Sequence, residues 1–258
     1  MTKKKILCVN DISGVGLCSL SVCMPILGST AVDSTAVELS PLPTAVLSAH
    51  TGYEGFTFRD LTEDFPAIFA HWKSMNVEFD FIYTGYFASE KQIDYTIEFI
   101  KEQKNNQPIT IVIDPVMGDD GALYTGFEKS FPAKMLELCK VTDIITPNLT
   151  EAALLLGTPP PKSYTEEDIQ DICKRLYEWT NSVVAVTGLS FTKDTISSAL
   201  YKDEKFQIFT REKLLPENQS GTGDMFSSVL VRELIAGNSI ESGINTAMDY
   251  VLAQFGNI

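Results

Sequence analysis

The sequence is poor in the residues that build several common kinds of site. It has two histidines among 258 residues, and its five cysteines are odd in number, scattered and without a C-x-x-C pair. A histidine-rich metal centre is therefore excluded, and the cysteine pattern favours reduced core residues over disulfides or a zinc site. Any metal must be a hard ion held by carboxylates, water or phosphate.

Positive charge is also scarce. Twenty Lys and Arg residues stand against 34 Asp and Glu, a formal net charge of −14, and so acidic a surface repels phosphate backbones and anionic lipid. No apolar run approaches the roughly 18 residues of a membrane span, and the basic start is followed only by the short apolar run 6–9, too short for a signal peptide. We expect a cytoplasmic protein that acts on small molecules, without nucleic-acid or membrane partners.

Two glycine motifs that hold nucleotide phosphates are missing or incomplete. There is no Gly-Lys dipeptide, so a Walker A loop is absent. Gly14-Val15-Gly16 follows a strand-like run, but Ser19 stands where a dinucleotide fingerprint needs Gly or Ala, and only Asp33 or Glu38 could serve as its ribose acid. A nicotinamide dehydrogenase stays an alternative, which predicts NAD(H) binding at residues 14–16.

Short β-rich runs alternate with amphipathic stretches. Parallel strands are predicted over residues 6–9, 79–84, 110–113, 143–146 and 183–187, and an antiparallel edge hairpin over 196–201 and 206–210. Helices are predicted over residues 19–27, 60–74, 90–103, 128–140, 149–156, 166–179, 225–236 and 240–255. The alternation predicts one α/β domain over residues 1–258, with helices on both faces of a mostly parallel central sheet.

The clearest candidate site is the segment 219–224, with the sequence QSGTGD, directly before an apolar-periodic helix. Glycines let a ligand approach the main chain closely, and the helix that follows offers N–H groups and a positive dipole end. Together they predict an anion site, most naturally for a phosphoryl group. The alternative is that Asp224 is only the N-cap of the helix.

Further polar residues follow predicted strand ends, where open α/β sheets bind ligands. Asp114 follows one strand, Asn148 and Glu151 follow the next, and Thr187 ends a third. Asp114, Asn148 and Glu151 could converge on one Mg²⁺, with water completing its shell. Alternatively, Asn148 caps its helix and Asp114 begins a turn.

In combination these motifs resemble a known family. They lie at residues 221–224 (GTGD), 114–116 (DPV), 146–151 (TPNLTE), 47–53 (LSAHTGY) and 83–86 (YTGY). In their order along the chain they resemble the vitamin-kinase branch of the ribokinase-like superfamily, and within it the pyridoxal kinases. The resemblance covers nearly the whole chain. It implies a three-layer α/β/α ribokinase-like fold and transfer of the γ-phosphoryl group of ATP to the 5′-hydroxymethyl group of pyridoxal, pyridoxine or pyridoxamine, as in pyridoxal 5′-phosphate salvage.

The resemblance also implies roles for individual residues. Asp224 would be the base, and the amides of Gly221, Thr222 and Gly223 the anion hole. The nucleotide side, with Mg²⁺ at Asp114 and Glu151, would comprise Asp114, Asp119, Tyr124, Asn148, Glu151 and Thr187. The vitamin side would comprise Asp11, Ser13, His50, Thr51 and Tyr86. From the residues alone, His50 could instead cap a turn and Tyr86 pack under a loop. ATP and Mg²⁺ are the implied cofactors, a monovalent cation such as K⁺ is an option, and a homodimer is the implied assembly.

One departure concerns the first loop. Residues 10–16, with the sequence NDISGVG, are closer to the hydroxymethylpyrimidine-kinase pattern, which leaves that activity, or dual specificity, as the alternative. An alternative of another class is a non-catalytic nucleotide- or vitamin-binding sensor, against which the intact Asp224 argues. The chain stops at Ile258, where the family usually continues, which could leave one side of the nucleotide pocket open; the alternative is that the sequence is truncated relative to the natural gene.

Overall fold

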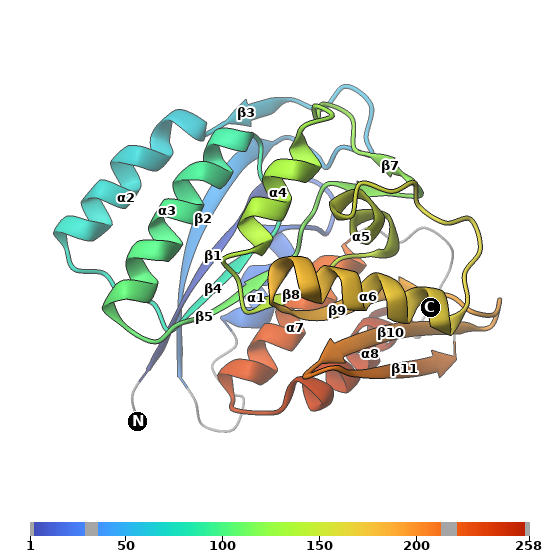
Figure 1. The fold of residues 1–258 in the computed structure, drawn as a ribbon. Coiled ribbons are helices and arrows are strands. Elements are labelled where there is room, and N and C mark those ends of the chain that lie inside the picture. The colour runs from blue at the N-terminus through green and yellow to red at the C-terminus, as the bar shows by residue number, and fades with distance from the viewer. Residues whose placement is uncertain (1–2, 29–35, 213–220, 256–258) are drawn as a thin grey trace.

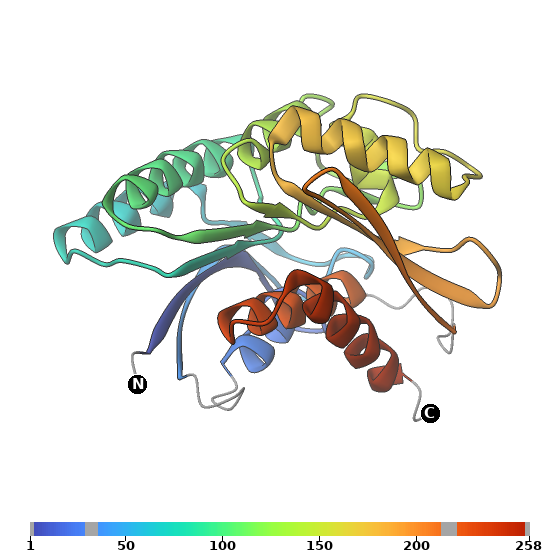
Figure 2. The ribbon, with the colours of Figure 1, turned by 60° about the horizontal axis from the view of Figure 1, so that its bottom comes forward.

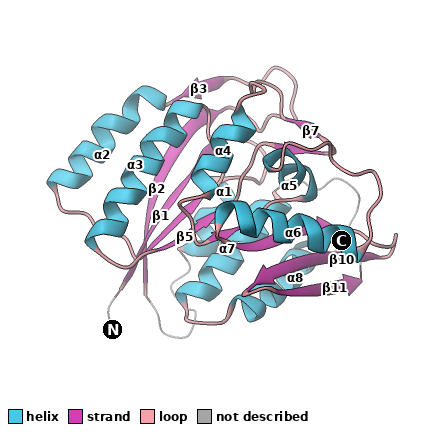
Figure 3. Cartoon of the chain, viewed as in Figure 1, coloured by secondary structure: helices cyan, strands magenta, loops and turns pink. Residues whose placement is uncertain are grey.

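A central sheet organises the computed structural model, which describes residues 3–28, 36–212 and 221–255 (Figure 1, Figure 3). These residues build a nine-stranded sheet in the order β11-β10-β9-β8-β5-β4-β1-β2-β3. Its strands are β1 Lys4–Ser13, β2 Val37–Leu47, β3 Phe58–Asp60, β4 Phe81–Thr84, β5 Thr110–Ile113, β8 Ile144–Ile145, β9 Val183–Leu189, β10 Thr195–Lys202 and β11 Lys205–Glu212. The ladder from β9 to β2 is parallel, whereas β3 and the edge hairpin β10–β11 are antiparallel. A separate ribbon pairs β6 Gly118–Asp119 with β7 Ala122–Leu123.

Helices cover both faces of the sheet. Figure 2 shows the cyan to yellow helices on one side and the blue and red helices on the other. The first group is α2 Phe65–Ser74, α3 Glu90–Asn106, α4 Phe131–Cys139, α5 Leu149–Leu155 and α6 Glu166–Thr180. The second is α1 Leu20–Leu27, α7 Thr222–Ile235 and α8 Ile240–Phe255. The predicted three-layer α/β/α architecture and its antiparallel edge hairpin are confirmed.

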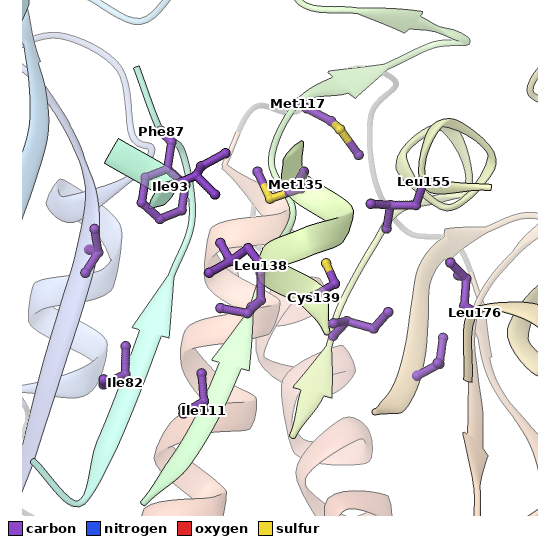
Figure 4. Packing of buried hydrophobic residues seen from close by; sticks show 14 of the residues in the cluster. Ile82, Phe87, Ile93, Ile111, Met117, Met135, Leu138, Cys139, Leu155 and Leu176 are labelled. Atoms are coloured by element: carbon purple, nitrogen blue, oxygen red, sulfur yellow. The ribbon is translucent and has the colours of Figure 1, made fainter. Parts of the chain in front are cut away.

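The two faces explain why the strands are continuously apolar. Successive side chains of a strand point to opposite faces, so Leu7 joins the core with Ile82 and Ile111 on the α2–α6 side, while Ile6 joins the core under α1, α7 and α8. Figure 4 shows Ile82 and Ile111 on the sheet below Leu138 of α4. A parallel sheet covered on both sides needs apolar residues at every position.

Several predicted elements have the expected bounds, and a few do not. The strand 110–113 and the helix 240–255 begin and end as predicted. The helix predicted over 60–74 begins only at Phe65 with Pro66 in its first turn, where proline is favoured, because β3 and a 3₁₀ turn, Thr62–Asp64, occupy the preceding residues.

Strand β2 was not predicted at all, because Pro41 and Pro43 interrupt its pattern. Both prolines pair with β1 on one side, whereas β3 covers only residues 45–47 on the other. They therefore lie where β2 is the edge of the sheet, a position that tolerates a missing N–H donor.

Two further observations bear on expectations from the sequence. All five cysteines are buried and free, as expected for reduced core residues. Among the described helices, none combines the length and the apolar character that a membrane span requires.

Candidate active site

The residues singled out in the sequence meet at one edge of the sheet. Strands β1, β4, β5, β8 and β9 run parallel, so their carboxyl ends lie at the same edge, and the first turn of α7 faces it, because Asp224 binds residues at the end of β1 and the start of α1. Such an edge is the usual ligand site of open α/β sheets. Strand β1 runs to Ser13, beyond the predicted Val9, so Asp11 and Ser13 are its last residues rather than loop residues.

Asp224 connects α7 to this edge. Its Oδ1 accepts a hydrogen bond from Nδ2 of Asn10 at 3.1 Å, and its Oδ2 accepts one from the backbone N–H of Ser19 at 2.8 Å. Burial raises the pKa of Asp224 to about 6, and the charge of Asp11 adds to this, while the two hydrogen bonds oppose it. Asp224 is the third residue of α7, so it is not the N-cap that the alternative interpretation required.

Gly221 is the N-cap of α7 and has a φ of +79°. A Cβ added to Gly221 would collide with the carbonyl oxygen of Leu17, so only glycine lets the start of α7 pack against the loop before α1. Gly223 is exposed, and the first N–H groups of a helix have no partner within the helix. The preceding Gln219 and Ser220 of the predicted motif lie outside the described residues.

Asp114 is tied to the same helix. Its Oδ2 accepts a hydrogen bond from Oγ of Ser227 at 3.0 Å, and Ser227 in turn lies 2.9 Å from Oγ1 of Thr146. Burial raises the pKa of Asp114 to about 8, and the charge of Asp224 contributes, against the Ser227 hydrogen bond. The site thus carries a buried carboxyl at the end of β5 and a partly buried one in α7, which influence each other electrostatically.

Asn148 and Glu151 form a capping box at the start of α5. Oδ1 of Asn148 accepts from the backbone N–H of Glu151 at 2.9 Å, and Oε2 of Glu151 accepts from that of Asn148 at 2.9 Å. Nδ2 of Asn148 donates to the carbonyl of Gly118, and Oε1 of Glu151 accepts from the N–H of Met117. The capping role, left open by the sequence, is therefore the one that the structure gives to Asn148.

The remaining nucleotide-side candidates surround this box. Thr187 forms a parallel bridge with Asn148, Asp119 lies exposed in β6, and the pKa of Tyr124 is raised first by burial and then by the charge of Glu151. Glu151 is buried, which raises its pKa well above the usual range, and the charge of Asp114 adds to the effect. In the part of the chain that is described, no group of three or more His, Cys, Asp or Glu side chains could by itself hold a metal ion.

The vitamin-side candidates lie on the β1, β2 and β4 segments. Asp11 is 5% exposed and accepts hydrogen bonds from Oγ of Ser13, at 3.1 Å, and Oγ of Ser19. Burial raises the pKa of Asp11, against these two hydrogen bonds. The ring of Tyr86 lies 5.4 Å from that of Phe127, centroid to centroid, so this half-buried tyrosine does pack on an aromatic neighbour.

His50 takes part in a local turn. Its Nδ1 accepts from the N–H of Gly52 at 3.0 Å, as the turn-cap interpretation expects. The same ring packs so closely on Gly16 that an added Cβ there would collide with it, which places the 50–53 segment against the first loop. Thr51 is exposed beside it.

Sequence reasoning missed three residues that contact the candidates. Asn10 and Ser19 bind Asp224, and Ser227 binds Asp114. Asn10 directly precedes Asp11, and a buried amide at a strand end next to a candidate acid is a usable signal. Ser19 binds Asp224 through its backbone N–H, which any residue could supply. Ser227 reaches Asp114 only because α7 packs against the end of β5, and no local sequence pattern reveals that contact.

Comparisons with known proteins agree on the kind of family. A family model described as phosphomethylpyrimidine kinase matches residues 53–257. A hydroxymethylpyrimidine/phosphomethylpyrimidine kinase from Aquifex aeolicus is 25% identical over 83% of this chain and 80% of its own. A pyridoxal kinase from Sus scrofa is 26% identical over 75% of this chain, and the match spans 65% of the porcine length.

Solved structures resemble the whole described fold. A protein assigned as a phosphomethylpyrimidine kinase from Bacteroides thetaiotaomicron, crystallised with pyridoxal, has a TM-score of 0.89 and 38% identity, covering 98% of this chain and 87% of its own. The pyridoxal kinase from Lactobacillus plantarum has a TM-score of 0.88 and 30% identity, with the same coverage of 98% and 87%.

Proposed function

The chain belongs to the phosphomethylpyrimidine kinase family, and we propose that it is an ATP-dependent kinase of the 5′-hydroxymethyl group of pyridoxal, pyridoxine or pyridoxamine. The observation that carries the proposal is the placement of Asp224. Its carboxylate lies at the start of α7, directly beside the glycines that open this helix, and is bound to the end of β1. A proton acceptor and an anion site are thus adjacent, as alcohol phosphorylation requires.

In the proposed mechanism, Asp224 accepts the proton of the attacking hydroxyl group. The backbone amides of Gly221, Thr222 and Gly223 stabilise the negative charge on the transferred phosphoryl group. With its raised pKa of about 6, Asp224 is still mostly ionised at neutral pH and is a stronger base than an exposed aspartate. The fixed orientation of its carboxylate removes an entropic cost from the transfer.

The nucleotide side fits a bound Mg²⁺ by its charge. Asp114 and Glu151 are buried carboxyls, and the negative charge of Asp114 raises the pKa of Glu151, so a divalent cation would relieve an excess of negative charge. Both oxygens of Glu151 already accept backbone N–H groups, which favours contact through water. When bound with ATP, Mg²⁺ neutralises charge on the phosphate oxygens. Asp119, Tyr124, Asn148 and Thr187 would line the phosphates.

On the acceptor side, Asp11, Ser13, His50, Thr51 and Tyr86 are the proposed contacts of the vitamin. The relative from B. thetaiotaomicron that was crystallised with pyridoxal supports a pyridoxal-type acceptor. The A. aeolicus relative supports the second candidate, hydroxymethylpyrimidine, whose hydroxymethyl group needs the same chemistry.

Three further properties are part of the proposal. Residues 1–258 act as one kinase domain, because β1 and the helices of the carboxyl-terminal part share one core. By resemblance to the family, the active form is a cytoplasmic homodimer. The same resemblance makes a monovalent cation such as K⁺ an optional activator.

The test is ADP release from Mg·ATP with pyridoxal, pyridoxamine or hydroxymethylpyrimidine supplied separately. Asp224→Asn should lower kcat by roughly 10²–10⁴-fold, the usual contribution of a general base. Asp249→Asn is the matched control. Asp249 lies on the surface of α8 and forms an ion pair with Arg211 of β11. Turnover of the pyrimidine alone would select the second candidate. Absence of turnover with every acceptor would overturn the kinase assignment, whereas a fully active Asp224→Asn variant would overturn the role of Asp224 as the base.

A further inference from the structure

The side chain of Asn10 connects two parts of the site. It is completely buried in the carboxyl-terminal half of β1. Its Oδ1 accepts hydrogen bonds from the backbone N–H groups of Asp11, at 3.0 Å, and Tyr86, at 2.9 Å. Its Nδ2 donates to Oδ1 of Asp224 at 3.1 Å and lies 3.8 Å from Sγ of Cys23.

These contacts fix which way the amide points. A flipped amide would place its NH₂ group against the two N–H donors of Asp11 and Tyr86, leaving buried donors without acceptors, which is costly. The NH₂ group must therefore face Asp224. Gly85 leaves the space for it, since a Cβ there would lie 2.5 Å from Nδ2.

Asp224 has few partners that stabilise its ionised form. Within residues 3–28, 36–212 and 221–255, its hydrogen-bond donors are Asn10 and the backbone N–H of Ser19. Among the residues that the structure describes, the titratable groups that interact with Asp224 electrostatically are acids, thiols or phenols: Asp11, Asp114, Cys18, Cys23, Tyr83 and Tyr124. In so acidic a setting, the amide of Asn10 is the side-chain donor that orients the carboxylate.

We propose that Asn10 is a positioning residue for the phosphoryl transfer, which holds the carboxylate of Asp224 toward the acceptor hydroxyl and ties it to the Tyr86 segment on the acceptor side. The role rests on the proposed function, because it needs Asp224 to be the base. It assigns Asn10 no contact with the substrate. Loss of the Asn10 amide donor should therefore lower kcat and leave acceptor binding nearly unchanged.

The decisive variant is Asn10→Asp, which has nearly the same shape. Its carboxylate can still accept from the N–H groups of Asp11 and Tyr86, but it presents an oxygen in place of the donor to Asp224. The two carboxyls then repel each other or share a proton, and the base loses its orientation. We expect kcat to fall roughly 100-fold, as misplacement of a catalytic group does, while the dissociation constant of pyridoxal, measured by calorimetry, changes less than about threefold.

A double-mutant cycle separates this role from a merely structural one. In an Asp224→Asn background, Asn10→Asp should cause no further loss of kcat, because its effect passes through Asp224. Gln103→Glu is the matched control: Gln103 is a buried amide that also binds two backbone groups, of Phe79 and Val77, at the opposite edge of the sheet. It should leave kcat unchanged. Asn10→Ala, which removes the donor without adding charge, should also lower kcat. Thermal unfolding is the check that each variant is folded.

The outcomes are distinct. A wild-type protein without turnover overturns the proposed function, and the role of Asn10 with it. An active wild type whose folded Asn10→Asp and Asn10→Ala variants keep the wild-type kcat overturns only the role of Asn10. An equal loss of kcat from Asn10→Asp with and without Asp224 also overturns it, because Asn10 would then act independently of the base.

Discussion

The backbone N–H of Ser19 holds Oδ2 of Asp224 at 2.8 Å, and Ser19 does so from a conformation with φ of +54° and ψ of −137° that serine rarely adopts. Strain of this kind costs on the order of 1–3 kcal/mol and persists only where surrounding contacts impose it. Here the hydrogen bonds of Ser19 to Asp224 and to Asp11 impose it. The strain is thus located at the contact that orients the proposed base.

Ser19→Gly and Ser19→Ala separate the strain from the side-chain contact. Both lose the hydroxyl bound to Asp11 and keep the backbone N–H, but only glycine adopts this conformation freely. We expect Ser19→Gly to be more stable than Ser19→Ala by about 1 kcal/mol in urea unfolding, after the greater entropy of the unfolded glycine variant is allowed for. Equal stabilities would mean that the conformation carries no strain.

The rate should depend on pH through Asp224. A base must be deprotonated, so with a pKa of about 6 activity is full above that pH and falls as the pH drops through it. The log of kcat/KM should therefore decline with a slope of one below about pH 6, in a profile measured with saturating Mg·ATP. An acid limb near pH 4, where an ordinary aspartate titrates, would contradict the raised pKa.

Stability should fall as the pH rises. Burial raises the pKa of Asp114 to about 8 and of Asp224 to about 6, so the folded protein binds more protons than the unfolded chain between about pH 4 and pH 8. Protonated carboxyls favour the folded state, and this contribution is lost as the pH rises through the folded pKa values.

Asp114→Asn tests this directly. It should raise Tm at pH 8, where each kcal/mol corresponds to about 2–4 °C for a protein near this size, and reduce the pH dependence of Tm, while lowering kcat. Asp143→Asn is a suitable control, because Asp143 accepts from the backbone N–H of Ile111 and pairs with Lys104 and should lose stability instead. If the Asp114→Asn variant were less stable than the wild type at pH 8, the folded protein would favour the ionised form of Asp114.

Two glycines at the ends of α7 form a matched pair. Gly221 at the start and Gly237 just after the end have φ values of +79° and +88°, but only at Gly221 would a Cβ collide with another segment, the carbonyl of Leu17. Gly237→Ala should cost about 1 kcal/mol of stability, from the backbone alone, with kcat unchanged. Gly221→Ala should cost more stability and also lower kcat, because it displaces the amides beside Asp224. Equal kcat values for the two variants would contradict the role of the α7 start.

Much of the site could be predicted, because a parallel sheet brings the carboxyl ends of its strands to the same edge. Once residues 110–113, 143–146 and 183–187 are recognised as neighbouring parallel strands, Asp114, Asn148 and Thr187 must lie at one edge. The motif around Asp224 is local and precedes an amphipathic helix, so its place was also predictable.

What escaped prediction depends on tertiary contacts. Strand β2 carries two prolines that only an edge position tolerates, and Asn10 looks like the end of a strand that in fact continues to Ser13. The partnership of Ser227 with Asp114 joins positions 113 residues apart, and the conformation of Ser19 is imposed by distant groups. No local pattern encodes such contacts.

The contact between β1 and α7 has a consequence for synthesis of the protein. Asn10 and Asp224 are separated by 214 residues, and α1 and β1 share their apolar core with α7 and α8. A nascent chain therefore carries the first half of the site, with one face of its sheet uncovered, until α7 has left the ribosome. Partial products should accordingly be inactive and prone to aggregation, and release of the finished chain, rather than the appearance of any single strand, sets the moment at which activity begins.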